Sequence, residues 1–141
     1  MEARQLYVLT ALQILGIGVL FWLLVAWKTP WNTQRYIGTL LAVMGVSLFG
    51  IARYELGKAF SVKPEVHELV TRGLYSKIRN PIYVFGIVTL TGVILVIQKP
   101  ELWIVLVFVV ITQVIRAHRE ARVLEAAFGD AYREYRRRTW F

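Results

Sequence analysis

The chain has 141 residues, of which 57% are hydrophobic and only 18% are charged, whereas charged residues make up about a quarter of an ordinary soluble domain. Its length predicts one domain, residues 1–141, and most of it must lie in a bilayer if each helical crossing uses about 20 residues. The absence of cysteine excludes disulfides and thiolate chemistry. The net charge is +8, but the basic residues lie at the borders of apolar runs, and this distribution disfavours nucleic-acid binding.

Four apolar runs predict an all-α integral membrane protein with about four transmembrane helices. The first run is longer than a signal-peptide core of about 7 to 15 residues, so it is interpreted as a retained helix. The break at residues 98–101 is short, so the last two helices form a hairpin, and Pro81 stands where the third helix begins. The predicted helices cover residues 6–27, 36–52, 82–97 and 102–118.

Two segments are polar enough to lie outside the bilayer. Residues 53–80 form a connection too long for a simple turn, and long loops are usually functional or disordered. Residues 119–141 are predicted to be a helical extension, broken near Gly129, that either continues the fourth helix or lies on the membrane surface.

The distribution of lysine and arginine predicts the orientation of the chain. Fourteen of these residues fall at the N-terminus, in residues 53–80 or after Ile115, and three fall in the two short turns. Positive residues accumulate on the cytoplasmic side, so both termini and the long loop are predicted to be cytoplasmic. The loop and the C-terminal extension can therefore meet.

Two motifs carry a resemblance to a known family. The stretch "HELVTRGLYSKIRNPIYVFG" resembles the "HxLVTxGPYxxxRHPxYxxG" pattern of the isoprenylcysteine carboxyl methyltransferases and related phospholipid methyltransferases. The stretch "RAHREARVLEAAFGDAYREY" is similar to that family's "RxxxEExxLxxxFGxxYxxY". Asn80, Leu74 and Ala121 depart from the pattern, where the family has His, Pro and Glu.

The resemblance implies an S-adenosylmethionine-dependent methyltransferase that acts on a lipophilic acceptor at the cytoplasmic membrane face. The sequence has only two histidines, His67 and His118, too few for a zinc site without carboxylates at suitable spacing, so no metal is expected. It implies that Arg116 reaches toward the acceptor and that the loop, the Pro81 turn and the extension hold the cofactor. Asn can still donate and accept hydrogen bonds, so cofactor binding tolerates Asn80. The implied cofactor-binding residues are His67, Glu68, Leu69, Val70, Tyr75, Asn80, Pro81, Ile82, Tyr83 and Glu120.

Other interpretations remain open at this point. The acceptor can be an isoprenylated carboxylate, a phospholipid amine or a small hydrophobic thiol or acid. A sterol-reductase-like protein that binds NADPH has a related Arg-His-Pro-x-Tyr stretch. A non-enzymatic four-helix transporter is disfavoured because the four apolar runs, the last of which ends at Ile115, contain no ionisable residue. Arg116 and Glu120 can also be a simple i, i+4 ion pair, and Arg136 to Arg138 a lipid-surface anchor.

Overall fold

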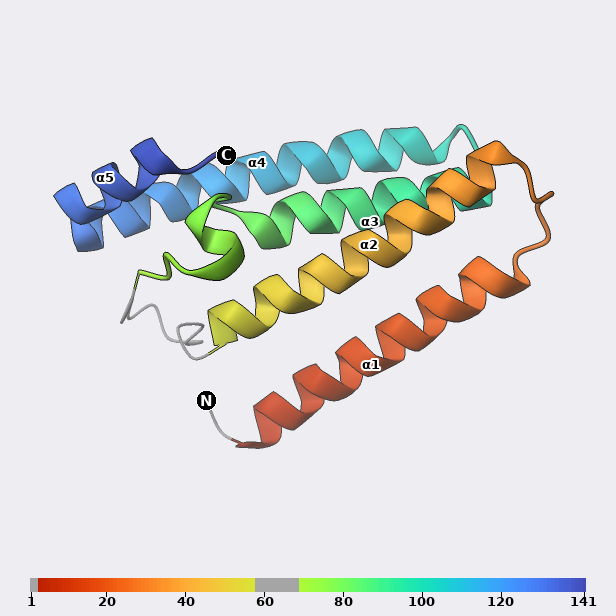
Figure 1. Ribbon diagram of the computed structural model, residues 1–141, viewed down its shortest axis with the longest axis horizontal. Helices are drawn as coiled ribbons and strands as arrows, with labels where there is room; N and C mark the ends of the chain where they lie inside the picture. Colours follow the sequence, from red (N-terminus) through yellow and green to blue (C-terminus); the bar gives the residue numbers. More distant parts are fainter. Residues whose placement is uncertain (1–2, 58–68) are drawn as a thin grey trace.

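The computed structural model describes residues 3–57 and 69–141, and these residues form helices without a strand. Figure 1 shows long helices lying side by side, with a short turn at one end and the C-terminal helix at the other. The elements are α1 (Ala3–Ala26), α2 (Thr33–Leu56), the 3-10 helix η2 (Gly73–Ser76), α3 (Pro81–Ile97), α4 (Leu102–Phe128) and α5 (Asp130–Arg138). The prediction of an all-helical fold is confirmed.

The helix predicted over residues 36–52 is longer at both ends, because α2 begins at Thr33 and continues to Leu56. Asn32 caps its N-terminus by accepting a hydrogen bond from the backbone N–H of Arg35 at 2.9 Å. The predicted run, residues 36–52, contains no Asp, Glu, Lys, Arg or His, but the longer helix also includes Arg35 in its first turn, and the Arg35 side chain is only 1% exposed.

Arg35 is tolerated there because the protein replaces the water that its charge loses on burial. Its guanidinium donates hydrogen bonds to the carbonyl oxygens of Leu24, at 3.0 Å, and of Thr29. It also lies 4.0 Å from the centre of the Trp31 ring, a favourable cation–π arrangement. Arg35 thus stabilises the turn between α1 and α2 from within the first turn of α2.

Helices α2 and α3 pack at very short distance because glycines line their contact. A Cβ on Gly38 would lie 2.7 Å from the carbonyl oxygen of Gly92, and a Cβ on Gly45 would lie 2.7 Å from the backbone nitrogen of Thr89. Small residues of this kind let membrane helices approach each other closely. α1 joins this pair through Leu24, which packs on Ala42 and Val96.

The outer surface of the helices is strongly apolar. Large side chains such as Phe21, Leu40 and Phe108 are each more than 60% exposed, which water would penalise and lipid would not. α2 and α4 are long and apolar enough to cross a membrane, whereas the described apolar part of α1 and all of α3 are shorter. With about 1.5 Å per residue, the 27 residues of α4 span roughly 40 Å, more than the hydrocarbon core of about 30 Å.

The fourth helix continues beyond residue 118 to Phe128, so the first part of the extension continues this helix, which is one of the two predicted alternatives. The chain then turns at Gly129, whose φ of +53° favours glycine, and α5 begins. The break near Gly129 is thereby confirmed. The polar residues that follow Ile115 belong to a helix because the segment has a buried side, at Ala117, as well as an exposed one.

We expect Gly92→Ala to destabilise the protein, because the added methyl group would overlap the backbone of Ala42, which cannot move aside without separating α2 from α3. Overpacking of this kind costs about 1 to 3 kcal/mol. The measurement is the thermal midpoint in detergent, followed by size-exclusion chromatography. Gly50→Ala is the matched control in the same pair of helices, since a Cβ there meets nothing within 4 Å. Equal midpoints for the two variants would contradict the packing argument.

Candidate functional site

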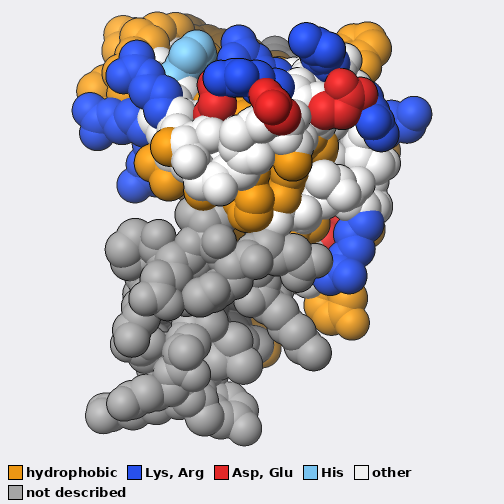
Figure 2. Space-filling view, turned by 90° about the vertical axis from the view of Figure 1, so that its left-hand side faces the viewer, with side chains coloured by type: hydrophobic (Ala, Val, Ile, Leu, Met, Phe, Trp, Pro, Cys, Tyr) orange, Lys and Arg blue, Asp and Glu red, His pale blue; other side chains and the backbone are white. Residues whose placement is uncertain are grey.

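The residues singled out by the motifs gather at one end of the bundle, which we call the polar end. It consists of the end of α2, the segment 69–80 with η2, the start of α3, and residues 116–141. In Figure 1 these parts lie together at the left, at the opposite end from the turn between α3 and α4. Figure 2 looks at this end and shows Lys, Arg and His side chains gathered across its upper part.

The segment before α3 is held against α2 by a carboxylate. The backbone N–H of Leu74 donates a hydrogen bond of 2.8 Å to Oε2 of Glu55. Gly73 makes this contact possible, because it has a φ of +59° and because a Cβ there would overlap the Glu55 carboxylate. The end of α2 therefore sets the position of η2.

The C-terminal residues also hold the segment before α3, through hydrogen bonds to its backbone. The Tyr135 hydroxyl donates a hydrogen bond of 2.8 Å to the carbonyl oxygen of Tyr75. The backbone N–H of Trp140 donates to the carbonyl of Lys77 at 2.7 Å, and the N–H of Arg79 donates back to Trp140 at 2.8 Å. The expectation that the loop and the C-terminal extension meet is thus correct for the described part of the loop.

A direct side-chain contact links α3 with α4 at this end. The hydroxyl of Tyr83, in the first turn of α3, donates a short hydrogen bond to Oε1 of Glu120 on α4. Arg116 lies one turn before Glu120 and close enough to Tyr83 to act on it electrostatically. Within the described part of the chain Arg116 and Glu120 form no ion pair, so Glu120 is positioned by Tyr83.

The other residues predicted to bind the cofactor differ in how deeply they are buried. His67 and Glu68 lie outside the described residues. Val70 and Tyr75 are buried in an apolar cluster with Ala52 of α2, and Leu56, Leu74 and Ile82 pack against this cluster. Pro81 is fully buried, and Leu69 and Asn80 are partly exposed. Several predicted residues therefore form the wall behind the site, while Asn80, Tyr83, Arg116 and Glu120 have side chains nearer its surface.

Burial keeps the tyrosines of this end protonated. Loss of water raises the pKa of Tyr75 well above its usual value, and Tyr135, Glu55 and Glu120 nearby raise it further. Burial, together with the neighbouring Tyr132, raises the pKa of Tyr135 to about 12, although Arg79 opposes the shift. Both hydroxyls therefore stay neutral hydrogen-bond donors at physiological pH.

A second feature of the polar end is a cavity of about 320 Å³ between α4, α5 and the segment before α3, which we call the basic cavity. The motif comparison assigned no role to most of its lining. His118 and Arg122, four residues apart, lie on one side of α4, so their spacing could have indicated a shared surface once the helix was known to continue. The charged and polar lining consists of Arg79, Asn80, His118, Arg122, Glu125 and Arg136.

One buried polar group was also absent from the predicted site. The side-chain oxygen of Gln113 is buried and has no hydrogen-bond partner among the described residues. Gln113 precedes Glu120 by seven residues, so the two side chains lie on the same side of α4, about 10 Å apart along its axis. A buried polar atom without a partner is costly unless a water molecule or a ligand bonds it.

We expect Tyr135→Phe to lower stability at neutral pH by about 1 kcal/mol, because the hydrogen bond to Tyr75 is lost. The folded-state pKa of about 12 exceeds the unfolded value of 10.0, so the contribution of Tyr135 is complete below pH 10 and is lost as the pH rises toward 12. The thermal midpoint of wild type should thus fall more steeply over this range than that of the variant. Tyr36→Phe, at an exposed tyrosine, is the control, and identical pH profiles for wild type and Tyr135→Phe would contradict the role of this hydroxyl.

Comparison with known proteins places these features in a family. The model of the phospholipid methyltransferase family matches residues 33–131, a range that includes α2, η2, α3, α4 and the Tyr83–Glu120 contact. No curated protein and no solved structure matches the chain. The family consists of membrane methyltransferases that act on lipid-type acceptors and generally use S-adenosylmethionine. The apolar exterior agrees with a place in the membrane, and the chain belongs to the phospholipid methyltransferase family.

Proposed function

We propose that this protein transfers a methyl group from S-adenosylmethionine to a lipophilic acceptor at the membrane surface, in the manner of the isoprenylcysteine carboxyl methyltransferases. The observation that carries the proposal is the Tyr83–Glu120 hydrogen bond, which joins the two motifs of the family resemblance at one place. We further propose that the polar end and both termini face the cytoplasm, where the cofactor is available.

The charges around Glu120 fit this cofactor. S-adenosylmethionine supplies a methyl group on a positively charged sulfonium, and a carboxylate among neutral tyrosines is a favourable environment for a cation. Only Oε1 of Glu120 is engaged by Tyr83, which leaves Oε2 to accept from the cofactor's hydroxyl or amino groups. In this proposal Leu69, Asn80 and Tyr83 contact the cofactor directly, as do His67 and Glu68, while Val70, Tyr75, Pro81 and Ile82 support them from the buried wall.

Methyl transfer from a sulfonium requires little acid–base catalysis by the protein. Donor and acceptor must be aligned, and water between them must be removed. Arg116 lies near Tyr83 and forms no ion pair with Glu120 in the part of the chain that the structure describes. It is therefore available to hold an anionic acceptor by paired hydrogen bonds. The side-chain oxygen of Gln113, which has no hydrogen-bond partner among residues 3–57 and 69–141 and lies further along the same side of α4, offers a polar contact to an acceptor that enters from the bilayer.

A phospholipid amine is the second candidate acceptor, and the family's own description favours it. The test is transfer of labelled methyl from S-adenosylmethionine to isoprenylated cysteine analogues and to phosphatidylethanolamine by the purified protein. A base-labile methyl ester supports the carboxyl acceptor, and a base-stable methylated lipid supports the amine. Transfer to neither acceptor, with no binding of S-adenosylmethionine, would refute the proposal.

We expect Glu120→Ala to weaken S-adenosylmethionine binding at least tenfold, because the variant removes the carboxylate that a hydrogen bond places beside Tyr83. Isothermal titration calorimetry on the detergent-solubilised protein measures the affinity. Glu101→Ala, at the far turn between α3 and α4, is the control and should bind as wild type does. Unchanged affinity in Glu120→Ala would remove Glu120 from the site, and tight binding of NADPH instead would favour a reductase-like protein.

Arg116→Ala should reduce turnover more than cofactor affinity, because its guanidinium is assigned to the acceptor. The labelled-methyl assay gives the turnover and calorimetry gives the affinity. Arg119→Ala removes an equal charge from the same helix and should retain turnover. The opposite pattern, a large loss of affinity with normal turnover at saturating cofactor, would assign Arg116 to the cofactor.

A further inference from the structure

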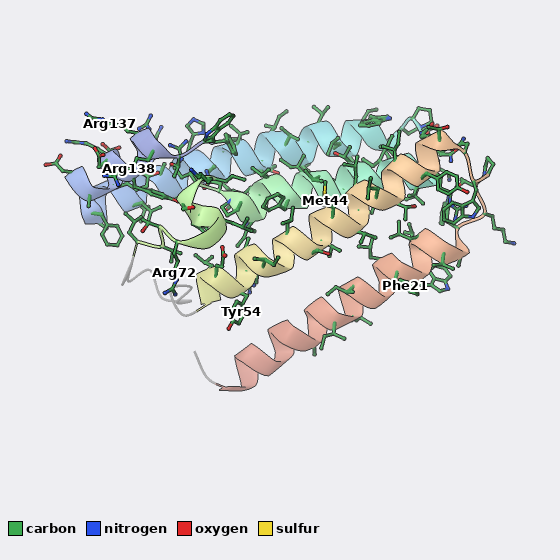
Figure 3. The ribbon with its side chains drawn as sticks, viewed as in Figure 1. Phe21, Met44, Tyr54, Arg72, Arg137 and Arg138 are labelled. Atoms are coloured by element: carbon green, nitrogen blue, oxygen red, sulfur yellow. The ribbon has the colours of Figure 1, made fainter. Side chains whose placement is uncertain are left out.

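The chain beyond α5 returns to the backbone that leads into α3 and pairs with it. Figure 3 shows Arg137 and Arg138, the last two residues of α5, at the polar end. The three residues that follow, 139–141, form a segment that we call the strap. Within the strap, Trp140 forms a parallel β-bridge with Ile78. The strap therefore lies directly beside the segment that precedes α3.

Three backbone hydrogen bonds join the strap to this segment. The N–H of Trp140 donates to the carbonyl of Lys77 at 2.7 Å, and the N–H of Arg79 donates to the carbonyl of Trp140 at 2.8 Å. The N–H of Asn80 donates to the carbonyl of Phe141 at 3.0 Å. The strap thus accepts from both N–H groups that directly precede α3 and fixes their direction.

The strap does what the side chain of Asn80 does not do. Asn80 stands at the N-cap of α3, but its side chain makes no hydrogen bond to the first turn, and its backbone has φ −124° and ψ 60°. At the N-cap of α2, by contrast, the side chain of Asn32 accepts from the N–H of Arg35, as asparagine commonly does at this position. The strap therefore holds the turn before α3, and the side-chain amide of Asn80 remains available to a ligand.

The turn held by the strap is connected to Glu120 through hydrogen bonds. The carbonyl of Asn80 accepts from the N–H of Tyr83 at 3.1 Å, and the hydroxyl of Tyr83 donates to Glu120. Phe141 and Asn80 also line the same cavity. A displacement of the strap would therefore move two residues that the proposed function places against the cofactor, Asn80 and Tyr83.

We propose that the strap is a positioning element for the cofactor: when residues 139–141 pair with the segment before α3, they hold Asn80 and Tyr83 in the geometry that binds S-adenosylmethionine. The identity of the ligand rests on the proposed methyl transfer. A site that is ordered before its ligand arrives binds more tightly, because the ligand does not have to order it. The strap acts through groups assigned to the cofactor, so it should control cofactor affinity more than turnover.

The strap can open locally because little of it is buried. The side chain of Trp140 is 79% exposed and that of Phe141 is 41% exposed, and segments with few buried contacts open more readily than packed helices. Coupling between two equilibria is reciprocal. If pairing of the strap strengthens cofactor binding by some factor, the bound cofactor must strengthen the pairing by the same factor.

Trp140→Pro removes the N–H that donates to Lys77 and should weaken S-adenosylmethionine binding at least tenfold, measured by calorimetry on the full chain in detergent. The residue before a proline favours an extended conformation, which Thr139 already has, with φ −116° and ψ 152°. Trp140→Ala keeps the N–H and should bind within twofold of wild type. Turnover of Trp140→Pro at saturating cofactor should stay within twofold of wild type, whereas a loss of folded protein would lower it.

Amide hydrogen exchange of the wild type tests the same coupling without a substitution. Saturating S-adenosylmethionine should slow exchange at the N–H groups of Trp140, Arg79 and Asn80 by about tenfold, because a bound cofactor favours the paired strap. The N–H of Gln98, bonded to the carbonyl of Ile94 at the opposite end of α3, is the control and should exchange at an unchanged rate.

The results separate this inference from the proposed function. Absence of S-adenosylmethionine binding by the wild type would refute the proposed function and the inference with it. Binding by the wild type with unchanged affinity in Trp140→Pro, or equal losses in Trp140→Pro and Trp140→Ala, would overturn the inference alone. If the thermal midpoint shows that Trp140→Pro does not fold, the wild type decides, since exchange at Trp140 that the cofactor leaves unchanged would also overturn the inference.

Discussion

Helices α2 and α3 touch at their backbones, and the position of every other part of the molecule follows from that contact. Gly38, Gly45 and Gly92 let the backbones of the two helices approach each other closely, so close packing and not the hydrophobic effect holds them together within lipid. Because the contact is so close, the two helices keep a fixed relation along their length. The end of α2 and the start of α3 are thereby brought to the same place.

The candidate site forms at this end because α4 and α5 also contact it. Glu55 at the end of α2 holds η2 through the backbone of Leu74, and Tyr135 of α5 holds the same segment through the backbone of Tyr75. Tyr83 then joins the start of α3 to Glu120. Each of these bonds links parts distant in sequence, so the site exists only when all four helices that supply it are in place.

The continuation of α4 beyond the apolar run separates two kinds of charge. One side of the helix carries Glu120, with Tyr83 bonded to it, and the other side carries His118 and Arg122, which line the basic cavity. A helix is the element that can present both sides within a few residues, because neighbouring side chains leave it in different directions. The polar end thus presents a carboxylate on one side of α4 and basic side chains on the other.

The sequence by itself determined the helical class, the membrane environment and the family, because apolar runs and motif spacing are local properties of the chain. It also indicated that the loop and the extension share one end, through the distribution of arginine and lysine. It did not predict that Arg35 lies inside α2, since that depends on carbonyl groups of Leu24 and Thr29 reached only after the turn has folded. The burial of Val70 and Tyr75 against Ala52, and the convergence of Arg79, Arg122 and Arg136 on one cavity, were likewise decided by the tertiary structure. Contacts between distant segments depend on how the helices pack, and no short stretch of sequence records that packing.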